Sequence, residues 1–380
     1  MSWPKIERES IPIPLLRWFA AAATLNFPQA AGPVAFSLVA LALTGSTSGG
    51  AALILVMTLA QVAGAVPITR AGAALPAARF LQGLILVRTL ALLLIALLVS
   101  VSAPFFWLYV AAAFAGCVNG AAHGYLRSIL NGLTHTSKLP RALGISTTLN
   151  EVTFVLAPVA ASGLGAISPI FAVVVIAILG AAPALLVPHV ASAHLEDVPQ
   201  ADVGVLTPSI ALWLFCAIAG GSAVAAIEIG AVALALSFDF APVWAVLFTI
   251  PLCFASVSGG IWISVWNQTP SRRMVAAFLS IMTLGSGLVA LQHSLSVTMI
   301  GTVMVGIALA PLGTYYSLAL DELTPPRKRP EVFAMLRTAN AVGVIFASAV
   351  LTATSLSAAL LLVTGLMLVA TITVAVRRDR

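Results

Sequence analysis

Four ionisable side chains fall inside long apolar stretches of this chain: Arg88, Glu151, Glu228 and Arg337. A charged group at bilayer depth costs about 2.5–3.5 kcal/mol on insertion scales, so it faces a cavity or a partner. A carboxyl group removed from water holds its proton more tightly and can exchange it near neutral pH. We therefore expect Glu228 and Glu151 to bind a coupling proton or the solute. The alternative is a structural ion pair with one of the buried arginines.

A polar stripe runs along the fourth apolar stretch, with a member at every fourth position: Asn119, His123, Arg127 and Asn131. Residues four apart lie on one face of a helix. Glycines repeat at the same spacing on the adjacent face: Gly116, Gly120 and Gly124. Small residues let helices approach closely in a membrane. We expect the glycine face to pack against neighbouring helices and the polar face to contact water, with His123 lining a cavity. Packing for His123, and interface positions for Arg127 and Asn131, are the alternatives.

Further candidates for solute contact lie near helix-bending prolines. Asn26 and Gln29 flank Pro28, and Tyr315 and Tyr316 follow Pro311. A proline releases backbone carbonyls, and nearby amides mark such kinks as contact points. A tyrosine pair can stack on a solute and hydrogen-bond to it. A simple kink or a packing role remains open for each pair.

The composition shows what must position these residues. Only 8% of the 380 residues are charged, 61% are apolar, and the mean hydropathy is +1.09. A soluble domain carries about 25% charged residues, so this chain cannot cover a water-exposed surface. Apolar stretches of about 20 residues, long enough to span a bilayer, recur throughout. They predict twelve transmembrane helices, at 14–43, 50–69, 78–101, 104–130, 142–166, 168–188, 208–236, 243–266, 274–293, 295–320, 331–352 and 354–376.

The basic residues indicate the orientation of these spans. All of the 18 lysines and arginines except Arg88 and Arg337 precede or open the first span, flank connections on one side or follow the last span. The connections on the other side contain none. Because basic residues favour the cytoplasmic side, both termini are predicted to be cytoplasmic. The Ala- and Val-rich composition suits the inner (cytoplasmic) membrane of a bacterium.

The chain divides into two similar halves. One long polar connection, 189–207, separates six spans from six spans. Six residues around the fourth connection recur 190 positions later: Leu130, Leu133, Thr134, Pro140, Asn150 and Val152 match Leu320, Leu323, Thr324, Pro330, Asn340 and Val342. Parallel repeats of this kind build one class of transporters. We expect an N-terminal six-helix bundle (1–188), a cytoplasmic linker (189–207) and a C-terminal six-helix bundle (208–380).

Two partial motifs add to this pattern. Thr69-Arg70-Ala71-Gly72 matches the core of a D-R-x-G loop signature after the second span, with Thr69 at the acidic position. Ala157-Pro158-Val159-Ala160-Ala161-Ser162 retains the proline and small residues, though not the glycines, of a G-P-x-x-G-G signature. Over nearly its whole length the chain resembles the major facilitator superfamily. That resemblance implies an all-α polytopic fold of two six-helix bundles related by a pseudo-two-fold axis. It also implies that the first, fourth, seventh and tenth spans line a central cavity.

The predicted function is secondary active transport of a small organic solute by alternating access, with proton-coupled efflux of an amphipathic drug or metabolite favoured. The alternative is proton-linked uptake of a polar or anionic solute such as a sugar, organic acid or siderophore; a non-transporting sensor or an enzyme is more remote. The proton-coupling candidates are Glu228, Glu151 and His123. The substrate-binding candidates are Asn26, Gln29, Asn119, His123, Arg127, Asn150, Glu228, Tyr315, Tyr316, Arg337 and Asn340. Arg337 could instead neutralise an acid, and Arg88 is expected to be structural.

Several classes of function find no support in the sequence. There is no phosphate-binding loop, so we expect no direct use of ATP and no other cofactor. The histidines and Cys117, Cys216 and Cys253 are too scattered to form a metal site or a disulfide framework. The formal net charge of +6 resides in short clusters beside the spans, so we expect no nucleic acid partner. The expected partners are a small-molecule substrate, protons and the lipid bilayer, and the expected state is a monomer without enzymatic activity.

Overall fold

The computed structural model describes residues 12–45, 48–188, 205–269 and 271–376, which form thirteen α-helices joined by short turns and 3-10 segments. The first seven are α1 (Ile13–Thr44), α2 (Ser48–Ala71), α3 (Ala77–Ser100), α4 (Phe105–Cys117), α5 (Asn119–Leu130), α6 (Leu139–Ile167) and α7 (Pro169–Leu186). The remaining six are α8 (Pro208–Ser237), α9 (Val246–Trp266), α10 (Arg272–Leu291), α11 (Leu295–Leu323), α12 (Arg329–Ala353) and α13 (Leu356–Val376). The described residues contain no strand.

Within the described residues, twelve segments are long and apolar enough to cross a membrane, and each coincides with a predicted span to within six residues at either end. The all-α polytopic fold is therefore confirmed. The fourth span differs in detail, because it is built from two helices, α4 and α5, which meet at Val118. No proline marks this break in the sequence, and the prediction had one continuous helix over 104–130.

Local sequence explains where the helices begin and end. Ser168 and Ser294 accept hydrogen bonds on their hydroxyls from backbone N–H groups three residues ahead, at 3.4 Å and 3.3 Å. These caps satisfy amide donors that a helix start leaves unpaired. At the other end, Gly45 takes a left-handed conformation (φ 71°) and stops α1. A residue without a Cβ adopts this conformation at little cost.

The helices form two bundles, each with its own apolar core. One large cluster draws its residues from α8 to α13 and is centred on side chains such as Phe248, Leu279 and Met367. Two others come almost entirely from α1 to α7, around Leu25 and Leu81 in one and Leu108 in the other. Residues 189–204 lie outside the described residues, so the division at the predicted linker stays a proposal.

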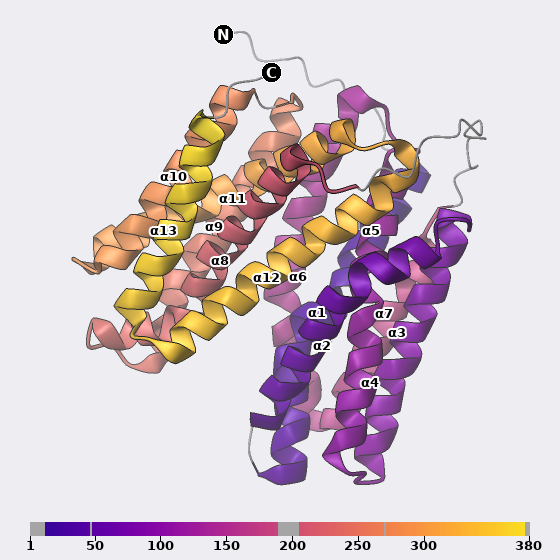
Figure 1. The fold of residues 1–380 in the computed structure, drawn as a ribbon. Helices are drawn as coiled ribbons and strands as arrows, with labels where there is room; N and C mark the ends of the chain where they lie inside the picture. Colours follow the sequence, from indigo (N-terminus) through magenta and orange to yellow (C-terminus); the bar gives the residue numbers. More distant parts are fainter. Residues whose placement is uncertain (1–11, 46–47, 189–204, 270, 377–380) are drawn as a thin grey trace.

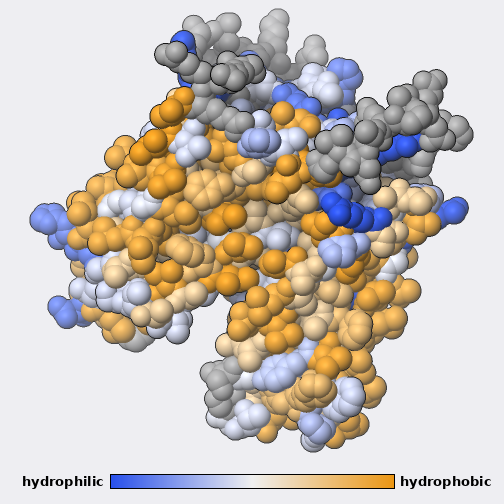
Figure 2. Space-filling view, in the orientation of Figure 1, coloured by the Kyte–Doolittle hydropathy of each residue, from blue (hydrophilic) through white to orange (hydrophobic). Residues whose placement is uncertain are grey.

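Large apolar side chains also cover the outside of both bundles, as Figure 2 shows. On α3, Leu86, Leu90 and Leu97 are 58%, 56% and 59% exposed. Soluble monomers rarely expose contiguous apolar surfaces of this extent. Such a surface suits contact with lipid chains, and the molecule is a multi-pass membrane protein.

The two bundles meet at one end and separate at the other (Figure 1). The end at which they meet carries the basic connections around Arg70, Lys138 and Arg327, and we call it the basic end. The N-terminal end of α1 and the C-terminal end of α13 both lie there. At the opposite end a hollow runs between the bundles, visible at the lower edge of the space-filling view (Figure 2). The molecule is thus closed at the basic end and open at the other.

Candidate functional site

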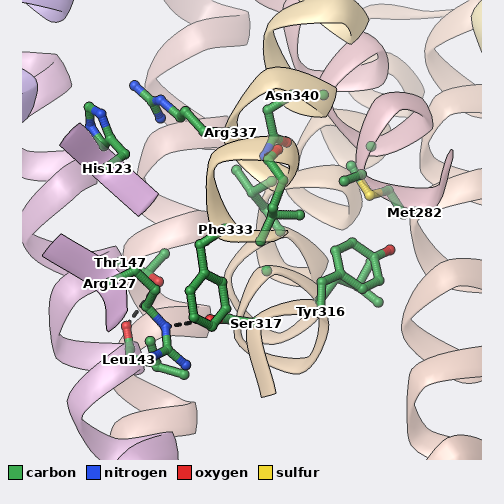
Figure 3. Close-up of a pocket in the computed structure, with 17 residues that line it drawn as sticks. His123, Arg127, Leu143, Thr147, Met282, Tyr316, Ser317, Phe333, Arg337 and Asn340 are labelled. Atoms are coloured by element: carbon green, nitrogen blue, oxygen red, sulfur yellow. Dashed lines mark hydrogen bonds between the residues drawn. The ribbon is translucent and has the colours of Figure 1, made fainter. Parts of the chain in front are cut away.

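A cavity of about 260 Å³ lies between the two bundles (Figure 3). It is lined by residues of α5, α6, α8, α10, α11 and α12: His123, Arg127, Leu143, Thr147, Ala217, Gly220, Gly221, Met282, Leu309, Leu312, Gly313, Tyr316, Ser317, Phe333, Leu336, Arg337 and Asn340. Three of these side chains are cationic or can become so, and many of the others are apolar. Among the described residues that line the cavity, none is Asp or Glu. The wall is therefore amphipathic, and its charged groups are all positive.

The glycines of the fourth span bring α5 close to both bundles. A Cβ on Gly120 would meet Ala65 of α2 at 2.8 Å. A Cβ on Gly124 would meet the carbonyl of Pro330 and, at 3.0 Å, the backbone nitrogen of Ala334, both on α12. The glycine face therefore packs within the first bundle at one position and against the second bundle at the next. This close approach turns His123 and Arg127, on the adjacent face, toward the cavity.

Arg127 is the centre of a polar cluster that joins the bundles at the basic end. Its Nε donates to Ser317 Oγ at 2.6 Å, and its Nη1 donates to Asn131 Oδ1 at 2.7 Å. Asn131 in turn donates to Asp321 at 2.5 Å. The guanidinium also lies 4.4 Å from the ring centroid of Phe333, a favourable cation–π arrangement. Its Nη2 is buried without a hydrogen-bond partner.

Two ion pairs reinforce this closed end. Arg329 lies 3.1 Å from Asp321, and Arg70 lies 2.7 Å from Glu331 across the bundles. The Arg70 side chain is 61% exposed, so its pair contributes little on its own. Asp321 is only 8% exposed and interacts with partners from both bundles, Asn131 and Arg329. Asp321 therefore links the two bundles through Asn131 and has Arg329 as its ion-pair partner.

A second polar network begins at Arg88, which is 3% exposed. Its guanidinium donates to the carbonyl of Leu25 at 2.9 Å, to Asn119 Oδ1 at 3.1 Å and to the carbonyl of Gly180 at 2.8 Å. It thereby holds α1, α5 and α7 around α3. All three acceptors are neutral, so the charge of Arg88 is solvated by dipoles rather than by an acid. The expected structural role agrees with this placement.

Asn119 extends the network toward α1 and α2. Its Nδ2 donates to Gln61 Oε1 at 2.7 Å and to Gln29 Oε1 at 3.1 Å. Because Asn119 Oδ1 accepts from Arg88, the orientation of this amide is fixed. Gln29 Oε1 accepts from Asn119 and can still accept a hydrogen bond from a further donor.

That further donor is Arg337, from the other bundle. Its Nη2 donates to Gln29 Oε1 and, at 3.2 Å, to Asn26 Oδ1. Its Nε is buried and has no hydrogen-bond partner. Across the described residues, no Asp or Glu pairs with Arg337 or Arg88. The ion-pair alternative for Glu151 and Glu228 therefore finds no arginine or lysine partner in the described part of the chain.

His123 contacts an oxygen on each side of its ring. Nδ1 lies 2.9 Å from the carbonyl oxygen of Asn119, and Nε2 lies 2.8 Å from Asn26 Oδ1. Asn26 Oδ1 therefore lies within hydrogen-bonding distance of both His123, from the first bundle, and Arg337, from the second. This single amide oxygen links the two halves at the edge of the cavity.

The carboxyl groups of Glu151 and Glu228 lie together, away from these cations. Glu151 and Glu228 are close enough to interact electrostatically, and Asn150 and Ser256 lie beside Glu151. The thiol of Cys253 is near both acids. Glu151 is half-buried and Glu228 is exposed. Since Thr147 lines the cavity and Glu151 is one helical turn beyond it on α6, the acids lie just past the cavity on the open side.

With this geometry established, comparison with known proteins identifies the family. The sequence pattern that describes the Major Facilitator Superfamily matches residues 18–348. The chain belongs to this superfamily. The chain matches no curated protein significantly in sequence. The family and the fold together make it a secondary transporter and not an enzyme.

Solved structures agree with the fold of this transporter. A bacterial homologue of the iron transporter ferroportin, outward-facing and soaked with iron, has a TM-score of 0.76 at 14% identity, over 96% of this chain and 99% of that one. The E. coli fucose:proton symporter gives 0.75 at 12% identity, over 98% and 100%. A human organic anion transporter gives 0.69 at 14% identity, over 95% and 98%. At such low identities the likeness shows the fold alone.

The structure brings most of the transporter's predicted site residues together. Five line the cavity: His123, Arg127, Tyr316, Arg337 and Asn340. Asn26, Gln29 and Asn119 form the hydrogen-bonded layer behind His123 and Arg337. Four belong to neither group: Asn150, Glu151, Glu228 and Tyr315, the last of which packs edge-on against Trp213 at 5.0 Å between ring centroids. Their roles remain predictions.

Sequence reasoning missed several residues of the transporter's site. Gln61, Thr147, Ser317 and Phe333 were not among the candidates, yet Gln61 joins the network and the other three line the cavity. For two of them a signal existed. Thr147 is the repeat equivalent of Arg337, and Ser317 is the repeat equivalent of Arg127. No comparable signal in the sequence singles out Gln61 or Phe333.

Proposed function

We propose that this transporter moves an amphipathic organic anion through the central cavity by alternating access. The observation that carries this proposal is the lining of the cavity. It presents His123, Arg127 and Arg337 with no acid among the described lining residues, beside an apolar wall that includes Met282 and Phe333. An anion with an apolar body matches both parts of this wall.

The hydrogen bonding of the arginines supports an anionic ligand. Arg127 Nη2 and Arg337 Nε are buried and unpaired, and the hydroxyl of Tyr316 in the same wall is unpaired as well. A buried charge is stable only when it is compensated and hydrogen-bonded. Guanidinium groups bind carboxylates in a fixed, charge-assisted geometry. A carboxylate in the cavity would supply the acceptor that these donors lack.

The proposed cycle exchanges the closed and open ends. In the present conformation the clusters around Arg127 and Asp321 hold the basic end closed, while the bundles are apart at the other end. Rocking of two repeats about a central site is the general mechanism of such folds. We place the basic end, and both termini, in the cytoplasm of a bacterial inner membrane. The cavity then faces outward in this conformation, and a single chain suffices as a monomer.

The acids support a second candidate, proton-coupled efflux of an amphipathic drug or metabolite. Glu151 and Glu228 lie together just beyond the cavity, and Glu228 is exposed. Two neighbouring carboxyl groups cannot both ionise easily, so the pair can retain a proton. In this scheme protonation of the pair alternates with binding of a solute that is neutral or cationic.

A matched series of ligands separates the two candidates. We would measure binding of 4-phenylbutyrate, 4-phenylbutanamide and 4-phenylbutylammonium to the protein in nanodiscs by calorimetry. The anion account predicts that only the carboxylate binds, and that Arg337→Gln weakens it by tenfold or more. Arg79→Gln, an exposed arginine outside the cavity, serves as the control and should bind normally. Preferential binding of the ammonium compound would refute the anion proposal and favour the second candidate.

A further inference from the structure

The hydrogen bonds of His123 indicate how many protons its ring needs. Both ring nitrogens lie within 2.9 Å of an oxygen. One is the backbone carbonyl of Asn119, which carries no hydrogen. The other is the side-chain oxygen of Asn26. A neutral imidazole has one N–H donor, whereas the doubly protonated ring has two.

The identity of the Asn26 oxygen is fixed by its other contacts. Asn26 Nδ2 donates to the carbonyl of Ala22 at 3.0 Å, so the amide nitrogen is already committed. The oxygen accepts from Arg337 Nη2 at 3.2 Å. Turning the amide around would place donors against Arg337 and acceptors against Ala22. His123 therefore faces two acceptors, and only the doubly protonated ring satisfies both.

Two guanidinium groups lie close to His123: Arg337 donates to the same Asn26 oxygen, and Arg88 donates to Asn119. Arg337 from α12 and Arg88 from α3 both act on the ring. Arg127 follows one turn later on α5, and Tyr316 of α11 lines the same cavity. Its partner on α1, Asn26, is neutral, and so is Gln61 of α2, which binds Asn119. Among the described residues no carboxylate acts on the ring, so nothing there offsets the added charge.

We propose that His123 takes up its second proton when the anion binds, so that one proton travels with each anion. The inference rests on the proposed anion function and names its coupling ion. The anion offsets the positive charge of Arg337 and Arg88, and the imidazolium then donates to both of its oxygen neighbours. The proton comes from water in the open hollow and returns to water on the other side. No covalent bond other than this N–H forms or breaks.

The proposal also sets the direction of transport. Proton and anion move together, so the transporter is a symporter. With an inward proton gradient the cycle drives uptake. This places the coupling proton in the anion site itself and not at the Glu151–Glu228 pair. Binding is reciprocal: if the anion favours the proton, the proton favours the anion by the same factor. Affinity for the anion therefore falls as pH rises.

Calorimetry with 4-phenylbutyrate in nanodiscs tests the inference. Phosphate and Tris have different ionisation enthalpies. At one pH, the binding heats measured in the two buffers therefore differ in proportion to the number of protons taken up. We expect about one proton for each anion bound to the wild type, and an affinity that falls about tenfold per pH unit over the range in which that proton is taken up. His123→Gln should take up no proton and bind with an affinity independent of pH. His293→Gln, an exposed histidine at the open end, should behave as wild type.

A second measurement does not depend on a variant that folds. In wild-type protein labelled with ¹⁵N-histidine, addition of 4-phenylbutyrate at pH 7 should convert one ring from the neutral to the doubly protonated spectrum. Anion binding with no such change, or proton uptake undiminished in His123→Gln, would overturn the inference and leave the anion function standing. Failure of the wild type to bind any carboxylate would overturn both.

Discussion

Arg127 Nε donates a 2.6 Å hydrogen bond to Ser317 Oγ, and the two residues stand 190 positions apart in the chain. The next pair along the same helices, Asn131 and Asp321, is also separated by 190 and is bonded at 2.5 Å. This is the offset at which the two halves of the sequence match. Residues at equivalent positions of the two repeats therefore meet each other, as they must where two helices cross on a symmetry axis. The contact closes the basic end.

Removing the acid at this crossing should open the basic end. Asp321→Ala leaves Arg329 and Asn131 without their partner, and loss of a buried hydrogen-bonded partner costs about 1–3 kcal/mol. We expect the population closed at the basic end to fall by about 5-fold or more. Distances between spin labels at Ser100→Cys and Ser355→Cys, in a background without native cysteines, should shorten as the open end closes.

Glu331→Gln is the matched comparison for that experiment. It removes a pair whose arginine is largely exposed, so its effect on the same distances should be small, within about 1 kcal/mol. Equal shifts in the two variants would show that the link from Asp321 to Asn131 has no special weight in closure.

The close approach at Gly124 should tolerate no larger side chain. A Cβ there would press on the backbone of α12 at Pro330 and Ala334, which cannot move without separating the bundles. We expect Gly124→Val to lower transport at least tenfold while the protein still folds. Gly163→Ala, where nothing lies within 4 Å of the new Cβ, is the control and should be neutral or slightly stabilising. Normal transport by Gly124→Val would contradict the observed packing.

Arg88 should govern stability more than transport specificity. Arg88→Met removes the donors to the carbonyls of Leu25 and Gly180 and to Asn119 Oδ1, and with them the tie that joins α1, α5 and α7 to α3. We expect a loss of about 2–5 kcal/mol, seen as a lower thermal midpoint in nanodiscs. Lysine cannot reproduce the three-way geometry of the guanidinium, so Arg88→Lys should recover only part of the loss. An unchanged midpoint in Arg88→Met would argue against a structural role.

Glu228→Gln separates the two proposed schemes. If His123 carries the coupling proton, this variant should keep one proton for each anion. If the Glu151–Glu228 pair carries it, solute exchange should persist while solute-driven proton movement is lost. Proton movement in proteoliposomes, followed with an internal pH dye, distinguishes these results.

The sequence was sufficient for the elements of the fold and for five of the residues that line the cavity. Twelve apolar stretches predicted twelve spans, because membrane-spanning length and composition leave few alternatives. The polar stripe on the fourth span predicted that His123 and Arg127 share a face, and both line the cavity. The break at Val118 was not predictable, since it depends on how α4 and α5 pack against neighbours.

Contacts between the bundles were beyond the reach of sequence patterns. Arg337 and Asn26 are 311 positions apart, and nothing local to either residue indicates that they meet. The sequence allowed the buried arginines to neutralise the buried acids. In the structure the arginines bind neutral oxygens instead, and the acids lie together just beyond the cavity. Tertiary packing alone decides between these two ways of compensating the charges.

Counterflow of radiolabelled 4-phenylbutyrate into proteoliposomes tests the central claim most directly. The account predicts that wild type and Arg79→Gln exchange the labelled anion, that Arg337→Gln is at least tenfold slower, and that excess unlabelled 4-phenylbutanamide does not compete. Equal exchange by Arg337→Gln and wild type, or competition by the amide as strong as by the carboxylate, would contradict an anion site at Arg337.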